Sequence, residues 1–372
     1  MKHEVVVLLR LRPHVPMHEA QVHRDIAMRI ADFLDIPFDG MFDSARHAGM
    51  RCYFVPDTTL VGSSALENYG IQNEMDLFGG YAEHDFMPTK AITHGLVSDN
   101  AARPAGWTNA FIASVGDATL PGYTAFSGTD LHTAAHLLLE QEKTVRVKPV
   151  HATAGRGQVM ITTAGEVEMA LAGQDAGAIS DCGIVLEAHL RDVKTYSVGQ
   201  FRLPGLTASY IGTQRLTLDN AGVEVYGGSR LCFTRGGFDT LLSLDLDADH
   251  RQAVEMAARY DAAADACYPG FFASRRNYDV AAGLDARGQR RVGVLEQSWR
   301  IGGASRAEIA AMEVLGADSS CQYLWAETLE IFGPDEIAPP HAIETFSGQD
   351  PDLGLIRKYV MVEPYGNKQR PD

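Results

Sequence analysis

Apolar positions in the first part of the chain change from a continuous run to helical spacing and back. Residues 5–11 form an apolar run that predicts a strand. Between Val22 and Leu34 the apolar residues recur three to four positions apart, which predicts a helix. A second strand is expected at residues 51–56, and Gly79 and Pro88 interrupt the pattern beyond it. This order indicates a small α/β unit that ends near residue 88.

From residue 89 the pattern predicts a mixed α+β region. Strands are expected at residues 145–150, 159–162, 183–187, 195–201, 209–214, 223–226, 271–280 and 291–297. Helices are expected at residues 91–97, 130–142, 166–176, 248–266 and 305–315. Ser305 and Glu308 fit a capping box that would open the last helix. After Gly333 the chain is rich in proline and aperiodic, and we expect it to run over the surface.

Charge and cysteine content narrow the class of protein. The 372 residues include 32 Lys and Arg against 48 Asp and Glu, a net charge of −16. This excess of acid argues against extended binding to nucleic acid or to anionic membranes, which requires clustered cations. No apolar run approaches the roughly 18–20 residues of a membrane span, and the N-terminus predicts a strand rather than a signal peptide. Five scattered cysteines fit free thiols in a reducing cytoplasm, where we expect the protein.

Two stretches suggest phosphate and metal chemistry. Lys148 ends a predicted strand and precedes a glycine-rich hairpin loop, an arrangement that can hold phosphate oxygens, although alone it is more often structural. Asp279 and Glu296 fall on adjacent strands if Gly288 makes the turn between them. Two converging carboxylates need a proton or a cation between them, and Mg²⁺ is the natural cation. Arg300, just beyond, is placed to bind a transferring phosphoryl group.

Three other motifs have more ordinary interpretations. The strand that ends in Glu187 could offer polar groups to a purine, but alone it is any buried strand. His132 and His136 share a helix face but lack the glutamate of a zinc-protease motif. The acidic residues at 245–249 are followed by His250 where a calcium loop requires glycine, so we interpret them as the solvated start of a helix.

In combination and in this order, the motifs resemble the ATP-grasp superfamily, and most closely an uncharacterised bacterial branch of it. The resemblance covers about residues 88–315. It implies two α+β subdomains that enclose ATP, preceded by a small Rossmann-like domain. The implied domains are residues 1–88, a small subdomain at 89–190, a large subdomain at 191–335 and a C-terminal tail at 336–372.

The resemblance also implies roles for individual residues. The implied nucleotide-binding residues are Lys90, Lys148, Gly155, Arg156, Gly157, Glu187 and Leu190. The implied Mg²⁺ ligands are Asp279, Glu296 and Ser298, with Arg300 and Lys148 as the catalytic cations.

At three positions the chain departs from the family pattern. Ser298 stands where the family has asparagine, so that its hydroxyl or Gln297 would have to substitute. Lys194 stands where many members carry an acidic ribose ligand. Asn277 stands where peptide-ligating members often have arginine, with Arg275 and Arg276 nearby but displaced.

The expected function is therefore an ATP- and Mg²⁺-dependent ligase that joins a small carboxylate to an amine through an acyl phosphate. The departures leave two alternatives on the same scaffold, a nucleotide-binding protein that has lost ligation and a kinase. A third alternative is an α/β protein in which the motifs are coincidental. The oligomeric state is left open, with a homodimer as one alternative.

Overall fold

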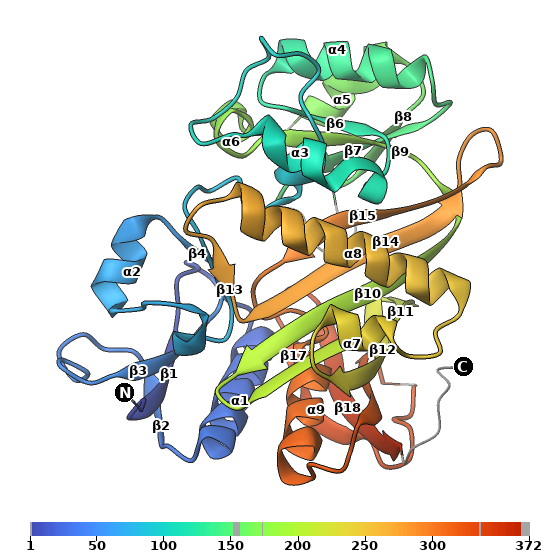
Figure 1. Cartoon of the computed structure of the whole chain (residues 1–372). Coiled ribbons are helices and arrows are strands. Elements are labelled where there is room, and N and C mark those ends of the chain that lie inside the picture. Colours follow the sequence, from blue (N-terminus) through green and yellow to red (C-terminus); the bar gives the residue numbers. More distant parts are fainter. Residues whose placement is uncertain (1, 152–156, 173, 335, 366–372) are drawn as a thin grey trace.

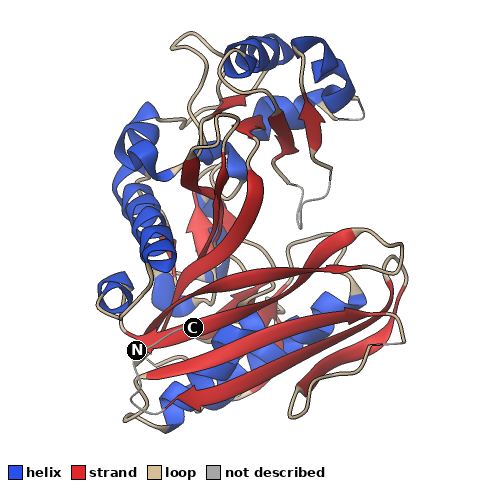
Figure 2. Cartoon of the chain, turned by 90° about the vertical axis from the view of Figure 1, so that its right-hand side faces the viewer, coloured by secondary structure: helices blue, strands red, loops and turns tan. Residues whose placement is uncertain are grey.

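The computed structural model describes residues 2–151, 157–172, 174–334 and 336–365. Helices pack against four β-sheets in this part of the chain, which confirms the mixed α/β class expected from the sequence (Figure 2). None of its helices combines the length and the apolar character of a membrane-spanning helix. All five cysteines are free thiols, as expected.

The N-terminal unit is built on a parallel three-stranded sheet. β1 (Val5–Leu9) lies between β2 (Phe38–Met41) and β3 (Cys52–Pro56). Parallel neighbours need a crossover connection, and α1 (Met17–Leu34) supplies it between β1 and β2. The predicted strand, helix and strand are thus present, and β2 is an additional strand between the helix and the second predicted strand.

A second small sheet joins this unit to the rest of the chain. Its order is β13-β5-β4, with β4 (Leu60–Val61), β5 (Gly80–Ala82) and β13 (Phe272–Ala273). Between β4 and β5 lie α2 (Ser63–Tyr69) and the 3₁₀ turn η1 (Glu74–Asp76). Because β13 belongs to the second half of the chain, this sheet fixes the N-terminal unit to the strand that follows β13.

A four-stranded antiparallel sheet of order β6-β9-β7-β8 lies at the top of Figure 1. Its strands are β6 (Gly122–Ala125), β7 (Val145–Pro149), β8 (Val159–Ile161) and β9 (Ile184–Ala188). One face packs on helices, which include α4 (Gly128–Leu139), α5 (Val167–Leu171) and α6 (Ala176–Cys182). Before the sheet come η2 (Lys90–Thr93), α3 (Asn109–Val115) and η3 (Gly116–Ala118), and η4 (Ala164–Glu166) precedes α5. β7 and β8 form the predicted hairpin.

The largest sheet has eight antiparallel strands in the order β15-β14-β10-β11-β12-β16-β18-β17. The strands are β10 (Arg191–Leu203), β11 (Leu206–Leu218), β12 (Glu224–Arg235), β14 (Arg275–Leu284), β15 (Arg290–Ser298), β16 (Tyr323–Phe332), β17 (Ile343–Asp350) and β18 (Gly354–Tyr365). The hairpin between β14 and β15 turns at Gly288, as predicted.

Helices cover the two faces of the large sheet at different ends. α8 (Ala248–Cys267) lies across β10, β14 and β15 (Figure 1), where it buries Tyr278 and Val280, and α7 (Phe238–Leu242) lies beside it. α1 and α9 (Ser305–Ala317) pack on the opposite face. Since side chains alternate along a strand, Asp279 lies on the face away from α8.

Four local predictions are wrong. The helix expected at residues 91–97 is only the 3₁₀ turn η2, and the helix expected at 166–176 is the single short α5. No capping box opens α9, because Glu308 is buried in an ion pair with Arg275. The chain beyond Gly333 is not irregular throughout, since β17 and β18 add a hairpin to the large sheet.

Candidate active site

A pair of carboxylates lies on the face of the β14–β15 hairpin that points away from α8. Asp279 on β14 and Glu296 on β15 are directly opposite each other, and a β-bulge follows at the next position. Burial and the negative charge of Glu296 raise the pKa of Asp279 to about 6. Two carboxylates in this arrangement are stabilised by a proton or a cation placed between them.

Neighbouring side chains orient both carboxylates. Oδ1 of Asp279 accepts hydrogen bonds from the side-chain amides of Gln214 at 2.7 Å and Asn277 at 3.0 Å. Oε2 of Glu296 lies 2.6 Å from Nζ of Lys90, which is 6% exposed. One oxygen of each carboxylate is therefore held by neighbouring side chains.

A second charged centre is buried in the four-stranded sheet. Nζ of Lys148 on β7 contacts Oε1 of Glu187 on β9, and Nε2 of His94 lies 3.1 Å from Oε2 of the same carboxylate. Burial alone would raise the pKa of Glu187, but Lys148 and His94 outweigh it and lower that pKa to about 2. Glu187 is therefore ionised at neutral pH.

One short turn connects the two centres. η2 carries Lys90 at its start and is followed directly by His94, so one segment contributes to both carboxylate centres.

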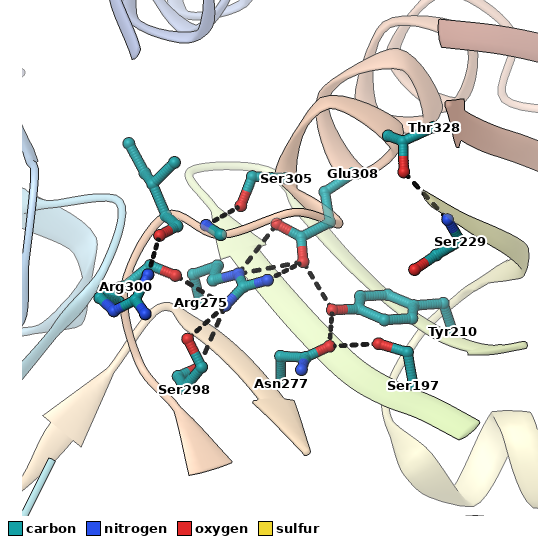
Figure 3. Close-up of polar contacts among 12 residues, drawn as sticks. Ser197, Tyr210, Ser229, Arg275, Asn277, Ser298, Arg300, Ser305, Glu308 and Thr328 are labelled. Atoms are coloured by element: carbon teal, nitrogen blue, oxygen red, sulfur yellow. Dashed lines mark hydrogen bonds and ion pairs between the residues drawn. The ribbon is translucent and has the colours of Figure 1, made fainter. Parts of the chain in front are cut away.

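A buried arginine organises the chain that follows β15 (Figure 3). The guanidinium of Arg275 binds both oxygens of Glu308 on α9, with contacts of 2.8 and 3.0 Å, and both side chains are at most 1% exposed. Its Nη1 also donates to the carbonyls of Ser298 at 3.1 Å and Arg300 at 2.6 Å. Arg275 thus fixes the turn that carries Arg300 against the first turn of α9.

The same glutamate is linked to the carboxylate pair through Tyr210 and Asn277, and Figure 3 shows these two side chains with Glu308. The hydroxyl of Tyr210 lies 2.6 Å from Glu308 and 2.9 Å from Oδ1 of Asn277, which also accepts from Ser197 at 2.6 Å. Burial and the charge of Glu308 raise the pKa of Tyr210. The amide of Asn277 donates to Asp279, so the position of Asp279 depends on contacts that extend to α9.

Ser298 and Gln297, which follow Glu296 and were candidates for metal binding, have other partners in this structure. Oγ of Ser298 accepts a hydrogen bond from Arg275 at 3.2 Å. Gln297 points to the opposite face, where its amide donates to the carbonyls of Met87 and Thr89. It is therefore not placed to substitute for a metal ligand. Arg300 is half-buried, and burial together with Arg275 lowers its pKa.

The remaining nucleotide-binding predictions are only partly covered by the structure. Gly155 and Arg156 lie outside the described residues, and Gly157 is exposed in the turn before β8. Leu190 is buried with Leu120 and Ala281 where the two larger sheets meet. Lys194, at the position of the expected ribose ligand, is exposed with its ammonium 5.1 Å from the ring centre of Tyr196. The role of each in binding stays a prediction.

The histidines of α4 and the acidic stretch before α8 have structural roles, as the sequence indicated. His132 pairs with Glu168 at 2.7 Å, and His136 with Glu140 at 3.5 Å, so they do not converge. Asp247 caps α8 by accepting from the backbone of His250. The part of the chain that the structure describes holds no group of three or more His, Cys, Asp or Glu side chains arranged to share a metal ion.

Sequence reasoning missed His94, Gln214 and the pair formed by Arg275 and Glu308. One sequence pattern could have indicated the position of Arg275. Arg275, Asn277 and Asp279 are alternate residues of one strand and therefore share a face. For His94 and Gln214 the sequence holds no comparable pattern.

The chain was compared with curated proteins, solved structures and family models. Curated proteins give no match. Similar solved structures include D-alanyl-alanine synthetase A from Vibrio cholerae, with 12% identity over 79% of this chain and 89% of that one and a TM-score of 0.40. D-alanine–D-alanine ligase from Bacillus anthracis complexed with ATP has 13% identity, coverage of 84% and 95%, and a TM-score of 0.44. The biotin carboxylase subunit of pyruvate carboxylase has 12% identity, coverage of 98% and 87%, and a TM-score of 0.36.

At these values the similarities transfer no activity to the chain. A family model matches residues 6–360, which is most of the chain. The chain thus belongs to the family described as "Protein of unknown function (DUF3182)".

Proposed function

We propose that the chain is an ATP-grasp ligase that uses ATP and Mg²⁺ to join a carboxylate to an amine through an acyl phosphate. The observation that carries the proposal is the connection of two charged centres by one turn. Lys90 meets the carboxylate pair on the large sheet, and Lys148 lies in the small sheet next to Glu187. In the proposal, phosphates lie between the two lysines and the base lies near Glu187 and Leu190.

The carboxylate pair fits Mg²⁺. Magnesium is usually held in proteins through one or two carboxylates, with phosphate oxygens and water completing its coordination. Asp279 and Glu296 supply two, and they lie directly opposite each other on neighbouring strands. When bound, the ion would neutralise charge on the phosphate oxygens.

The reaction requires activation of a poor electrophile. A carboxylate resists attack by an amine, whereas the acyl phosphate formed by transfer of the γ-phosphoryl group carries a good leaving group. In the proposal, Lys90, Lys148 and Arg300 stabilise the charge that spreads over the transferring oxygens. The amine then displaces phosphate, so that ADP, phosphate and the joined product are released.

One observation favours a second function, nucleotide binding without ligation. Ser298 is bonded to Arg275, and Gln297 faces away, so neither residue is placed to add a metal ligand to the two carboxylates. A site with fewer ligands could bind Mg·ATP and fail to transfer the phosphoryl group.

Product analysis distinguishes the functions. Purified protein receives Mg·ATP with pools of carboxylates and amines, and ADP, phosphate and new products are followed. Release of ADP and phosphate that depends on both pools supports the ligase, and phosphorylated carboxylate formed without amine indicates a kinase. Tight binding of ATP without turnover would replace the ligase with the binding protein. Glu296→Gln should abolish turnover, whereas Glu224→Gln, at an exposed position on β12, should not.

A further inference from the structure

The proposed function gives no role to the buried His94, which lies in the small-sheet charged centre. His94 is 2% exposed and follows η2, and its Nε2 lies 3.1 Å from Oε2 of Glu187. An ionised carboxylate only accepts hydrogen bonds, so Nε2 of His94 carries a proton and donates it to Glu187. The other oxygen of Glu187 contacts Lys148. The carboxylate is thus held on two sides by two different groups.

The neighbouring strand leaves space for this imidazole. Gly122 on β6 is directly opposite Glu187 on β9. A Cβ at Gly122 would lie 2.7 Å from Nδ1 of His94 and 2.6 Å from the carbonyl oxygen of Leu186. Both distances are shorter than van der Waals contact, so any larger residue at this position would displace the imidazole or the strand.

The backbone around His94 is fixed as well. Thr124 on β6 donates from its amide to the carbonyl of Gly95 at 2.8 Å and from its hydroxyl to the carbonyl of Ala91 at 2.7 Å. These bonds hold the segment on both sides of His94 against β6. The contact between His94 and Glu187 therefore arises from an ordered backbone and a matching space.

The charges explain why a second partner for Glu187 matters. In the proposed function, the ammonium of Lys148 binds phosphate oxygens, so it is shared with or removed from Glu187. A buried carboxylate without a partner is costly, and it is stabilised only by groups that remain beside it. His94 contacts Oε2 of Glu187, whereas Lys148 contacts Oε1, so the contact of His94 does not require Lys148.

We propose that His94 is a positioning residue of the nucleotide site: it holds Glu187 in place, so that Lys148 can move to the phosphates. This inference rests on the proposed nucleotide site. It predicts that His94 acts through Glu187, and that what matters is a donor at the position of Nε2 rather than the ring itself.

The test measures the Kd of Mg·ATP for the full chain by calorimetry, without carboxylate or amine. His94→Leu and His94→Asn both remove the donor that reaches Glu187, the second because its amide is too short. Each should raise Kd about tenfold, equivalent to about 1.4 kcal/mol. His94→Gln, whose amide nitrogen reaches close to the position of Nε2, should stay within about threefold of wild type. Two donor-removing variants keep the test valid if one of them does not fold.

A double-variant cycle separates positioning from a general structural effect. In a Glu187→Gln background, His94→Leu should change Kd less than about twofold, because the charge it supports is gone. His132→Leu removes a similar pair with Glu168 on the same subdomain and should leave Kd unchanged. A folded His94→Leu protein with wild-type affinity, or a full tenfold effect in the Glu187→Gln background, would overturn the inference. Failure of the wild type to bind Mg·ATP would instead overturn the proposed function, and this inference with it.

Discussion

The buried ion pair between Arg275 and Glu308 allows a stability prediction with a defined size. Arg275→Met keeps an apolar stem of similar length but leaves Glu308, which is fully buried, without its cation. Removing one partner of a buried pair costs about 3–5 kcal/mol, because the remaining charge is uncompensated. With roughly 2 °C per kcal/mol for a protein of this size, the thermal midpoint should fall by about 6–10 °C.

A second variant tests whether the uncompensated charge is the cause. Arg275→Met combined with Glu308→Leu leaves no uncompensated charge at this position, so most of the lost stability should return. Arg29→Met is the control, because Arg29 and Glu313 form an ion pair of 2.9 Å between α1 and α9 with side chains 41% and 38% exposed. Such surface pairs contribute at most about 1 kcal/mol.

Differential scanning fluorimetry at neutral pH is sufficient for the comparison. The reasoning fails if Arg275→Met melts within about 1 °C of the Arg29→Met control. It also fails if the double variant is as unstable as the sum of the two single variants, since the loss would then come from packing rather than charge.

Three further predictions concern the charged centres. Lys148→Ala should raise the Kd of Mg·ATP about tenfold or more, as calorimetry would show, because a charge-assisted contact is worth about 1.5–3 kcal/mol. Glu296→Gln should lower turnover far more than it lowers the thermal midpoint, because the amide keeps the shape of the side chain but not its charge. In the unfolded chain Glu187 binds a proton as the pH falls through 4.5, whereas in the folded protein it does so only near pH 2. The stabilisation of the folded state by ionised Glu187 is therefore complete above pH 4.5 and is lost as the pH falls from 4.5 toward 2. Between pH 7 and pH 3, urea titrations should therefore show wild type losing about 2 kcal/mol more than Glu187→Gln; equal losses would mean that Glu187 is not held ionised.

The parts of the fold that the sequence predicts are those with a local signal. The β14–β15 hairpin is predictable because apolar alternation flanks a glycine turn, and this places Asp279 opposite Glu296. β17 has no such signal: it is an edge strand of mostly polar residues in which Phe346 is the single buried apolar side chain. Its position comes from long-range contacts, such as the edge-to-face packing of Phe346 on His18 of α1.

In the candidate site, a residue that fits a local sequence pattern can instead form a long-range contact. Ser305 and Glu308 satisfy the spacing of a capping box, yet Glu308 pairs with Arg275, which is 33 positions earlier in the chain. A buried guanidinium with two carboxylate contacts stabilises the glutamate more than an exposed cap would. No pattern within one helix can report this partner, since it depends on how α9 packs on β14.

Residues adjacent in sequence on β15 connect these observations. Glu296 faces away from α8 and binds Lys90, whereas Gln297 faces α8 and binds the carbonyls of Met87 and Thr89, on the chain that leads into Lys90. Tyr260 of α8 in turn donates to Gln297 at 2.9 Å. The strand that supplies a carboxylate therefore also fixes the backbone next to its cation. Because successive side chains point to opposite faces, a slip of one residue in β15 would exchange these two functions, which ties the geometry of the site to the register of the sheet.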